Sequence, residues 1–105
     1  MISKDIIKQL AAEELEDANA KHEPRFHSPH EAYAVLLEEF EELKAEVEYM
    51  EFILKNMWQA IKRDNNHVGL CEVLKKTTIQ AIQEGIQVIA MCDKAMDAGK
   101  KIEAQ

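Results

Sequence analysis

Apolar residues recur every three or four positions in three long stretches of this 105-residue chain. The stretches cover about residues 3–20, 29–63 and 70–98, and short polar segments separate them. Ser3 stands where it can cap the first stretch, and Gly99 where it can end the third. No segment sustains the strict alternation of a β-strand. The pattern therefore predicts an all-α fold, a helical bundle with three main helical segments.

The sharpest local feature is Ser28-Pro29-His30-Glu31, at the start of the second stretch. A serine hydroxyl followed by proline and, three residues on, by glutamate is typical of a capped helix start. A single helix over 29–63 would span roughly 50 Å at about 1.5 Å per residue. That length exceeds a compact domain of this size. We expect the segment to bend, to break near residues 48–51, or to pack against a second subunit.

Composition limits the possible classes of function. The composition, with 47% hydrophobic and 31% charged residues, is typical of a soluble globular protein, and the length predicts a single domain, residues 1–105. The core of such a small domain is modest, so association with other copies would stabilise it. A formal net charge of −7 disfavours nucleic-acid and membrane-surface binding. Neither a signal peptide nor a membrane-spanning stretch is recognisable, and the two cysteines form no C-x-x-C pair. These features indicate a cytoplasmic protein with reduced thiols.

The acids are unevenly placed, because residues 1–51 contain 14 acids and 5 bases, whereas residues 52–105 contain 6 acids and 8 bases. A helical projection of the second segment sorts its glutamates. Glu41 and Glu48 point away from the predicted core and are solvated. The projection centres that core on one stripe of large apolar side chains: Leu36, Phe40, Leu43, Val47 and Leu54.

Three other glutamates, Glu39, Glu42 and Glu46, lie on the flank of this stripe. In the third segment, Glu84 lies at the edge of the core, next to Gly85, where another helix can approach closely. Like charges at such spacing repel, and a cation would relieve the repulsion. These acids are a candidate cation site, although acid-rich helices commonly carry glutamates at the edge of an apolar face without binding a metal.

Glu38-Glu39-Phe40-Glu41-Glu42 followed by Glu84-Gly85-Ile86-Gln87 resembles the E-E-x-x-E and E-x-x-D motifs of the MazG-like all-α nucleoside triphosphate pyrophosphohydrolases. The surrounding sequence, over roughly residues 28–98, looks similar to small phage and bacterial members. The family pattern has aspartate where this chain has Gln87, and the interval between the two motifs is longer here.

The resemblance implies a homodimer or homotetramer that hydrolyses an NTP or dNTP to the monophosphate and pyrophosphate. It implies Mg²⁺, with Mn²⁺ as a substitute, held by Glu39, Glu42 and Glu84. Glu38 would be a further ligand or the catalytic base. Gln87 would contribute an amide oxygen, which binds Mg²⁺ more weakly than a carboxylate.

Several residues have a second interpretation. Lys94, on the same strip as Gln87, is a candidate phosphate contact, or else an ordinary surface lysine. Tyr33 and Trp58 are expected in the core rather than stacked on a base. The histidines of residues 22–30 lack the spacing of a zinc site. The alternative to an enzyme is a non-catalytic helical oligomer that serves as an interaction or regulatory module.

Overall fold

The computed structural model describes the backbone of residues 1–104 and the side chains of residues 1–99. It contains three helices, α1 (Lys4–Lys21), α2 (Pro29–Lys62) and α3 (Val68–Ala104), and no strand in the range described. The predicted all-α fold with a long second segment is therefore confirmed. None of the described helices combines the length and the apolar character needed to cross a membrane.

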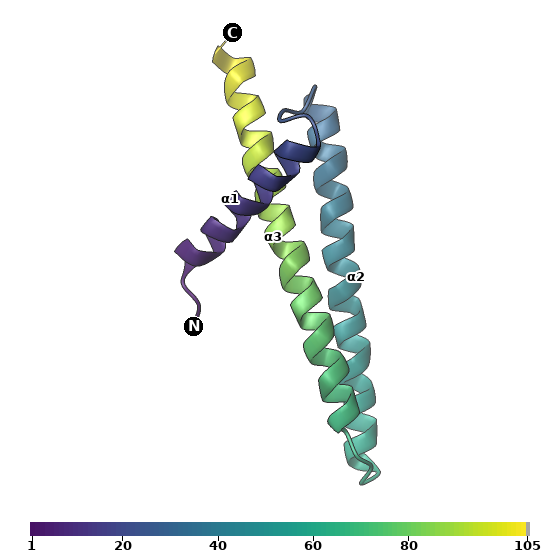
Figure 1. Ribbon diagram of the computed structural model, residues 1–105. Coiled ribbons are helices and arrows are strands. Elements are labelled where there is room, and N and C mark those ends of the chain that lie inside the picture. Colours follow the sequence, from purple (N-terminus) through teal and green to yellow (C-terminus); the bar gives the residue numbers. More distant parts are fainter. Residues whose placement is uncertain (105) are drawn as a thin grey trace.

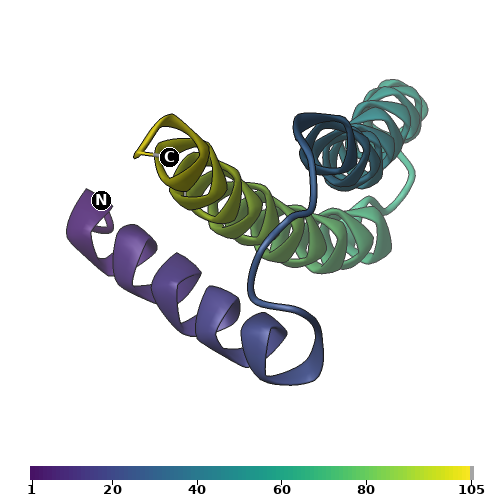
Figure 2. The same cartoon turned by 90° about the horizontal axis from the view of Figure 1, so that it is seen from above.

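The long helices α2 and α3 lie side by side and antiparallel, as Figure 1 shows, and the molecule measures 65 × 27 × 22 Å. The shorter helix α1 packs against α3 and, within the described residues, not against α2. Figure 2 shows α3 between the other two helices, with the connection from α1 passing across it. The fold is a helical hairpin with a third helix on one side.

Both predicted helix starts are present. The Ser3 hydroxyl oxygen accepts a hydrogen bond from the Asp5 amide at 3.1 Å, and the Ser28 oxygen accepts one from the Glu31 amide at 3.1 Å. Each bond satisfies an amide that has no partner within its own helix. Pro29 follows in the first turn, where it displaces no hydrogen bond.

Helix α2 is continuous over 34 residues, which excludes one of the three expected alternatives, a break near residues 48–51. The chain accommodates its length because α3 runs beside it and the molecule is elongated rather than compact.

The predicted limits of the third segment were wrong at both ends. Helix α3 begins at Val68, where the side-chain oxygen of Asn66 accepts a hydrogen bond from the Val68 amide at 2.9 Å and so satisfies an amide that has no partner within the helix. Gly99 does not end it, and no glycine among the described residues has a positive φ. Glycine permits the left-handed conformation that stops a helix but does not impose it. The helix continues to Ala104.

The two long helices meet along a seam in which residues alternate at spacings of three and four, as in a coiled coil. Every seam residue is buried or half-buried. On α2 the seam contains Ala32, Leu36, Glu39, Leu43, Glu46, Met50, Ile53, Met57 and Ala60. On α3 it contains Leu70, Leu74, Thr77, Ala81, Glu84, Val88, Met91, Ala95 and Ala98.

This seam corrects the predicted core. Phe40, Val47 and Leu54, placed at the centre of the core stripe, are each 51% exposed, and Tyr33 and Trp58 are exposed as well. The side of α2 that meets α3 is turned toward the glutamates, so Glu39 and Glu46 occupy seam positions. The projection erred because α2 has two neighbouring apolar rows, and periodicity cannot tell which of them the chain itself covers.

Candidate metal centre

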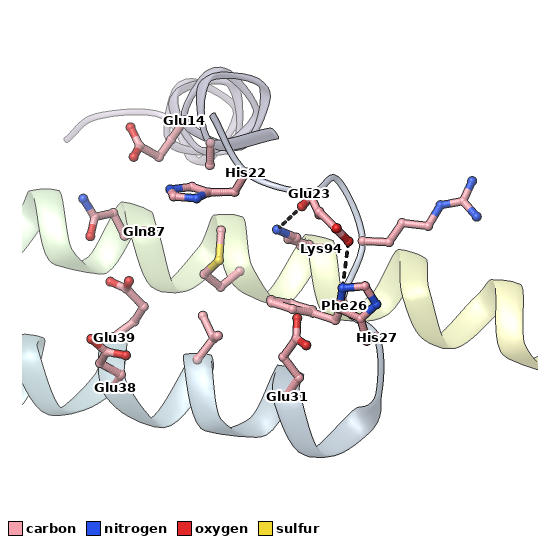
Figure 3. Close-up of a pocket in the computed structure, with 14 residues that line it drawn as sticks. Glu14, His22, Glu23, Phe26, His27, Glu31, Glu38, Glu39, Gln87 and Lys94 are labelled. Carbon is pink, nitrogen blue, oxygen red and sulfur yellow. Dashed lines mark hydrogen bonds and ion pairs between the residues drawn. The ribbon is translucent and has the colours of Figure 1, made fainter. Parts of the chain in front are cut away.

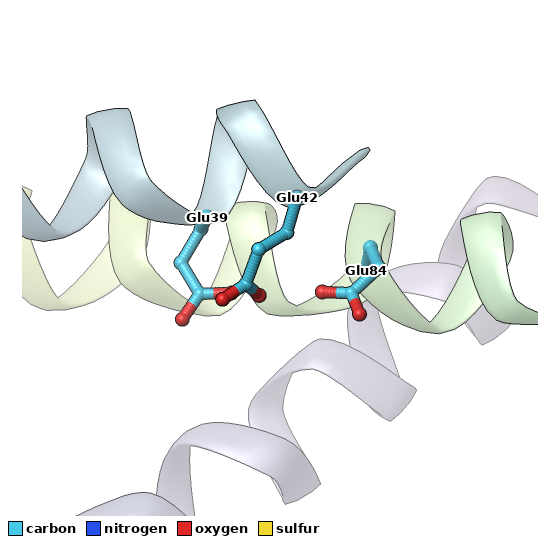
Figure 4. A group of neighbouring side chains, drawn as sticks. All are labelled: Glu39, Glu42 and Glu84. Atoms are coloured by element: carbon cyan, nitrogen blue, oxygen red, sulfur yellow. The ribbon is translucent and has the colours of Figure 1, made fainter. Parts of the chain in front are cut away.

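The carboxylates of Glu39 and Glu42 on α2 and of Glu84 on α3 come together at the hairpin (Figure 4). We call this group the carboxylate triad. Each residue offers one oxygen, and these oxygens all lie within 4.8 Å of one another. Glu39 and Glu84 are half-buried seam residues of the two helices, and Glu42 lies beside them on α2. The structure thus assembles the three carboxylates proposed from the sequence, while Glu46 lies elsewhere in the seam.

Two oxygens of the triad lack a protein partner. Oε2 of Glu39 and Oε2 of Glu84 are buried and accept no hydrogen bond. The other carboxylate oxygen of Glu84 accepts a hydrogen bond from the Gln80 side chain at 2.9 Å. Buried polar atoms are nearly always satisfied, so two orphaned oxygens in one cluster are unusual. A hard cation would supply the missing partner for both.

The pKa values of two of the three acids, Glu39 and Glu42, are raised. Burial raises the pKa of Glu39 above its ordinary value, and the neighbouring charges of Glu42, Glu84, Glu38 and Glu14 raise it further. The main cause of the raised pKa of Glu42 is that its protonated form can donate a hydrogen bond to the Glu84 carboxylate, and desolvation and the charges of Glu84 and Glu38 raise this pKa further. Both shifts oppose the charged form. The metal-free site therefore carries an electrostatic cost that a bound cation would remove.

A cavity of about 720 Å³ adjoins the triad and shares Glu39 with it (Figure 3). It lies where α1, α2 and the connection between them surround α3, and its volume suits a drug-sized or nucleotide-sized molecule. Its wall has apolar parts, Ala18, Val35, Phe26 and Met91, among charged and polar ones. The remaining lining residues are Glu14, His22, Glu23, Arg25, His27, Glu31, Glu38, Gln87 and Lys94.

Glu38 and Gln87, the other two site residues expected from the sequence, both line this cavity. Glu38 is exposed and lies close enough to raise the pKa of Glu39. Figure 3 shows the Gln87 amide on α3 across from Glu39 on α2. Both residues therefore border the triad on its cavity side.

Lys94 lines the cavity as a buried residue and is not the ordinary surface lysine of the second interpretation. It is only 8% exposed, and its ammonium group donates a hydrogen bond of 2.8 Å to the Glu23 carbonyl oxygen. The same group lies 4.7 Å from the centre of the Phe26 ring. Lys94 thus fastens the α1–α2 connection to α3 and is not a free surface lysine. Its charge is already engaged by a carbonyl dipole and an aromatic face.

The sequence interpretation overlooked Phe26, which is buried and forms part of the cavity wall. Its signal was available: it is the only large apolar residue in the polar segment NAKHEPRFHSPH. The histidines of this segment show no metal-type grouping in the described part of the chain, although His27 Nε2 lies 2.7 Å from Glu23 Oε2. The connection contributes Phe26 and His27 to the wall of the cavity.

Comparison with known proteins yields no match to a family model, to a curated protein or to a solved structure.

Proposed function

We propose that this chain is a Mg²⁺-dependent nucleotide pyrophosphohydrolase that converts an NTP or dNTP and water to the monophosphate and pyrophosphate. One observation carries the proposal: three carboxylates from two helices converge beside a cavity of nucleotide size. The likeness of the two glutamate motifs to those of the MazG-like enzymes supports the same conclusion.

The residues present fit Mg²⁺. The triad offers hard oxygen ligands, and two of its buried oxygens have no other partner. A bound cation would also offset the repulsion between the three carboxylates. Glu39, Glu42 and Glu84 would hold the ion, and Gln87 could add an amide oxygen from the cavity side. When bound, Mg²⁺ supplies neutralisation of the phosphate charge and Lewis-acid activation at phosphorus.

The chain's own residues have separate tasks in this scheme. The apolar wall formed by Val35, Phe26 and Met91 takes the nucleoside, which leaves the phosphates at the triad end of the cavity. Glu38, exposed at that end, orients the attacking water and accepts its proton. Lys94 acts as a positioning residue, because its ammonium group holds Phe26 and the connection in place.

The test is pyrophosphate release from a panel of NTPs and dNTPs with Mg²⁺ or Mn²⁺. Glu39→Gln and Glu42→Gln should abolish turnover, because each removes a ligand charge. Glu41→Gln is the matched control: Glu41 is exposed on the same helix and lies outside the triad, so this variant should keep wild-type activity. No turnover with any substrate, or equal turnover in Glu39→Gln and wild type, would refute the proposal.

A second candidate, a non-catalytic helical oligomer that serves as an interaction or regulatory module, is favoured by the exposed apolar residues of α2. It predicts no turnover and no metal response. A rise in melting temperature with Mn²⁺ that Glu39→Gln removes would argue against it.

A further inference from the structure

Glu14 on α1 is a half-buried acid to which the proposed scheme gives no role. It lines the large cavity together with Glu39, and it also lines a smaller hollow of about 460 Å³ between α1 and α3, which we call the groove. No donor among the described residues forms a hydrogen bond or an ion pair with its carboxylate. Glu14 is therefore a charge without a partner at the edge of the cavity.

Gln87 on α3 is the one other described residue that lines both the cavity and the groove. In Figure 3, Gln87 lies between Glu14 on α1 and Glu39 on α2. Its amide nitrogen is on the side of Glu14, and its amide oxygen is on the side of Glu39. The side chain of Gln87 thus spans the space between α1 and the triad.

The two ends of this amide suit different neighbours. A carboxylate only accepts hydrogen bonds, so the NH₂ group of Gln87 is the end that can bind Glu14. The amide oxygen gains nothing from Glu39, because both are acceptors, but it can share a cation with that carboxylate. A carboxylate at position 87 could serve the cation but would repel Glu14. Glutamine is the side chain that serves both.

The charge of Glu14 already acts on the triad in the metal-free structure. It is one of the charges that raise the pKa of Glu39, so the two carboxylates are close enough to repel each other. Docking of α1 therefore brings a negative charge toward a group that is already negative. A cation at the triad would weaken or reverse this repulsion.

Helix α1 is held weakly enough for one such contact to matter. Within the described residues it packs on α3 alone, and Ala11 is its one buried residue. Two of its apolar side chains, Ile6 and Leu10, remain 47% and 39% exposed. A hydrogen bond to a carboxylate is stronger than one between neutral groups, so it can shift the balance between docked and detached α1.

We propose that Gln87 couples occupancy of the triad to the docking of α1: its amide oxygen faces the bound cation while its NH₂ group donates to the Glu14 carboxylate and fastens α1 to α3. This inference rests on the proposed function, because it requires a cation at the triad. Glu14 and Gln87 are then positioning residues, since α1 forms part of the cavity wall. By linkage, docking of α1 raises the affinity for the cation by the same factor.

Amide hydrogen exchange of the full chain, in EDTA and in saturating Mg²⁺, tests the coupling. A helix of 18 residues is marginal by itself, so α1 unwinds when it detaches and its amides exchange. Mg²⁺ should slow exchange in residues 4–21 of wild type at least about fivefold, the lower end of ordinary coupling between sites. Exchange in residues 58–72, around the turn far from α1 in Figure 1, should stay the same.

Two variants break the link at either end. Gln87→Met keeps the length and helix propensity of the side chain but removes both polar groups of the amide. The three carboxylates remain, so this variant should still bind Mg²⁺, more weakly, in isothermal titration calorimetry. At saturating Mg²⁺ the slowing in residues 4–21 should nevertheless be lost. Glu14→Met should lose it too, because the acceptor is gone.

Glu16→Met is the matched control: Glu16 is exposed on the same helix and lines neither the cavity nor the groove, so the wild-type slowing should remain. A purely electrostatic effect of the ion on Glu14 would survive in Gln87→Met, which has the charges of wild type, and its survival would overturn the proposal. So would a wild type that binds Mg²⁺ by calorimetry without slower exchange in α1, although the metal centre would then stand. A wild type that binds no Mg²⁺ would refute the metal centre and this inference together.

Discussion

Replacing Glu39 by glutamine should stabilise the metal-free protein while removing its response to metal. Glu39 is half-buried, has an oxygen without a hydrogen-bond partner and faces the negative charges of Glu42 and Glu84. The substitution keeps the shape of the side chain and costs almost nothing in helix propensity. Few substitutions separate a metal site from a solvated acidic face so cleanly.

The size of the effect can be worked from these contacts. Removing the two like-charge repulsions gains about 0.5 kcal/mol each. The new amide group can donate a hydrogen bond to a carboxylate of the triad, a gain of about 1 kcal/mol. The free energy of unfolding should therefore rise by about 1–2 kcal/mol, which moves the melting temperature up by roughly 4–16 °C for a chain of this size.

The assay is thermal unfolding followed by circular dichroism, first in EDTA and then with Mg²⁺ or Mn²⁺. In EDTA, Glu39→Gln should melt above wild type, whereas Glu41→Gln should match it. With metal at about one hundred times its dissociation constant, wild type should gain about 2.7 kcal/mol and the variant far less. If Glu39→Gln melts at or below wild type in EDTA, the triad is not electrostatically strained and the reasoning fails.

Two further outcomes follow from the same contacts. The raised pKa values of Glu39 and Glu42 mean that the folded, metal-free chain binds protons more tightly than the unfolded chain, whose carboxyl groups titrate at the ordinary value of 4.5. This contribution to stability is fully present below that value and is lost as pH rises through the raised pKa values. The advantage of Glu39→Gln over wild type in EDTA should therefore be constant well above the raised pKa of Glu39 and should shrink as pH falls through that pKa toward 4.5; an advantage independent of pH would contradict it. Lys94→Met keeps the packing of the side-chain stem but loses the contacts of the ammonium group to Glu23 and Phe26. The free energy of unfolding, measured in urea, should therefore fall by about 1–2 kcal/mol, and amide hydrogen exchange should become faster in residues 22–28. Lys62→Met is its control, because Lys62 also lies over an aromatic ring, 5.6 Å from the centre of Trp58, but is exposed; an equal loss in both variants would show that burial of Lys94 is unimportant.

Local rules predicted the helix starts well because the necessary atoms are neighbours in sequence. Ser28 and Glu31 are three residues apart, and their hydrogen bond forms as the prediction requires. The convergence of Glu39 and Glu42 with Glu84 was also foreseeable, because the motifs placed these acids at the edges of two apolar faces. The position at which α3 ends could not be predicted, because Gly99 is compatible both with stopping a helix and with continuing it.

Two features depend on tertiary structure and could not be predicted. Phe40 and Val47 have the same periodicity as a buried row, and only the position of α3 determines that Glu39 and Glu46 face the seam instead. The burial of Lys94 depends on a connection 71 positions away in sequence, whose course no local pattern specifies.

The docking of α1 has a consequence for the order of folding. Only residues 63–67 join α2 to α3, so the hairpin can close outward from this turn through contacts that are each local when they form. Within the residues that the structure describes, helix α1 packs only on α3, and its partners lie beyond the whole of α2 in sequence. We therefore expect α1 to dock after the hairpin closes and to detach first on unfolding. The cavity has α1 residues in its wall and exists only after this last step. The fraction of molecules in which the cavity is formed therefore depends on the attachment of α1 as well as on the stability of the hairpin.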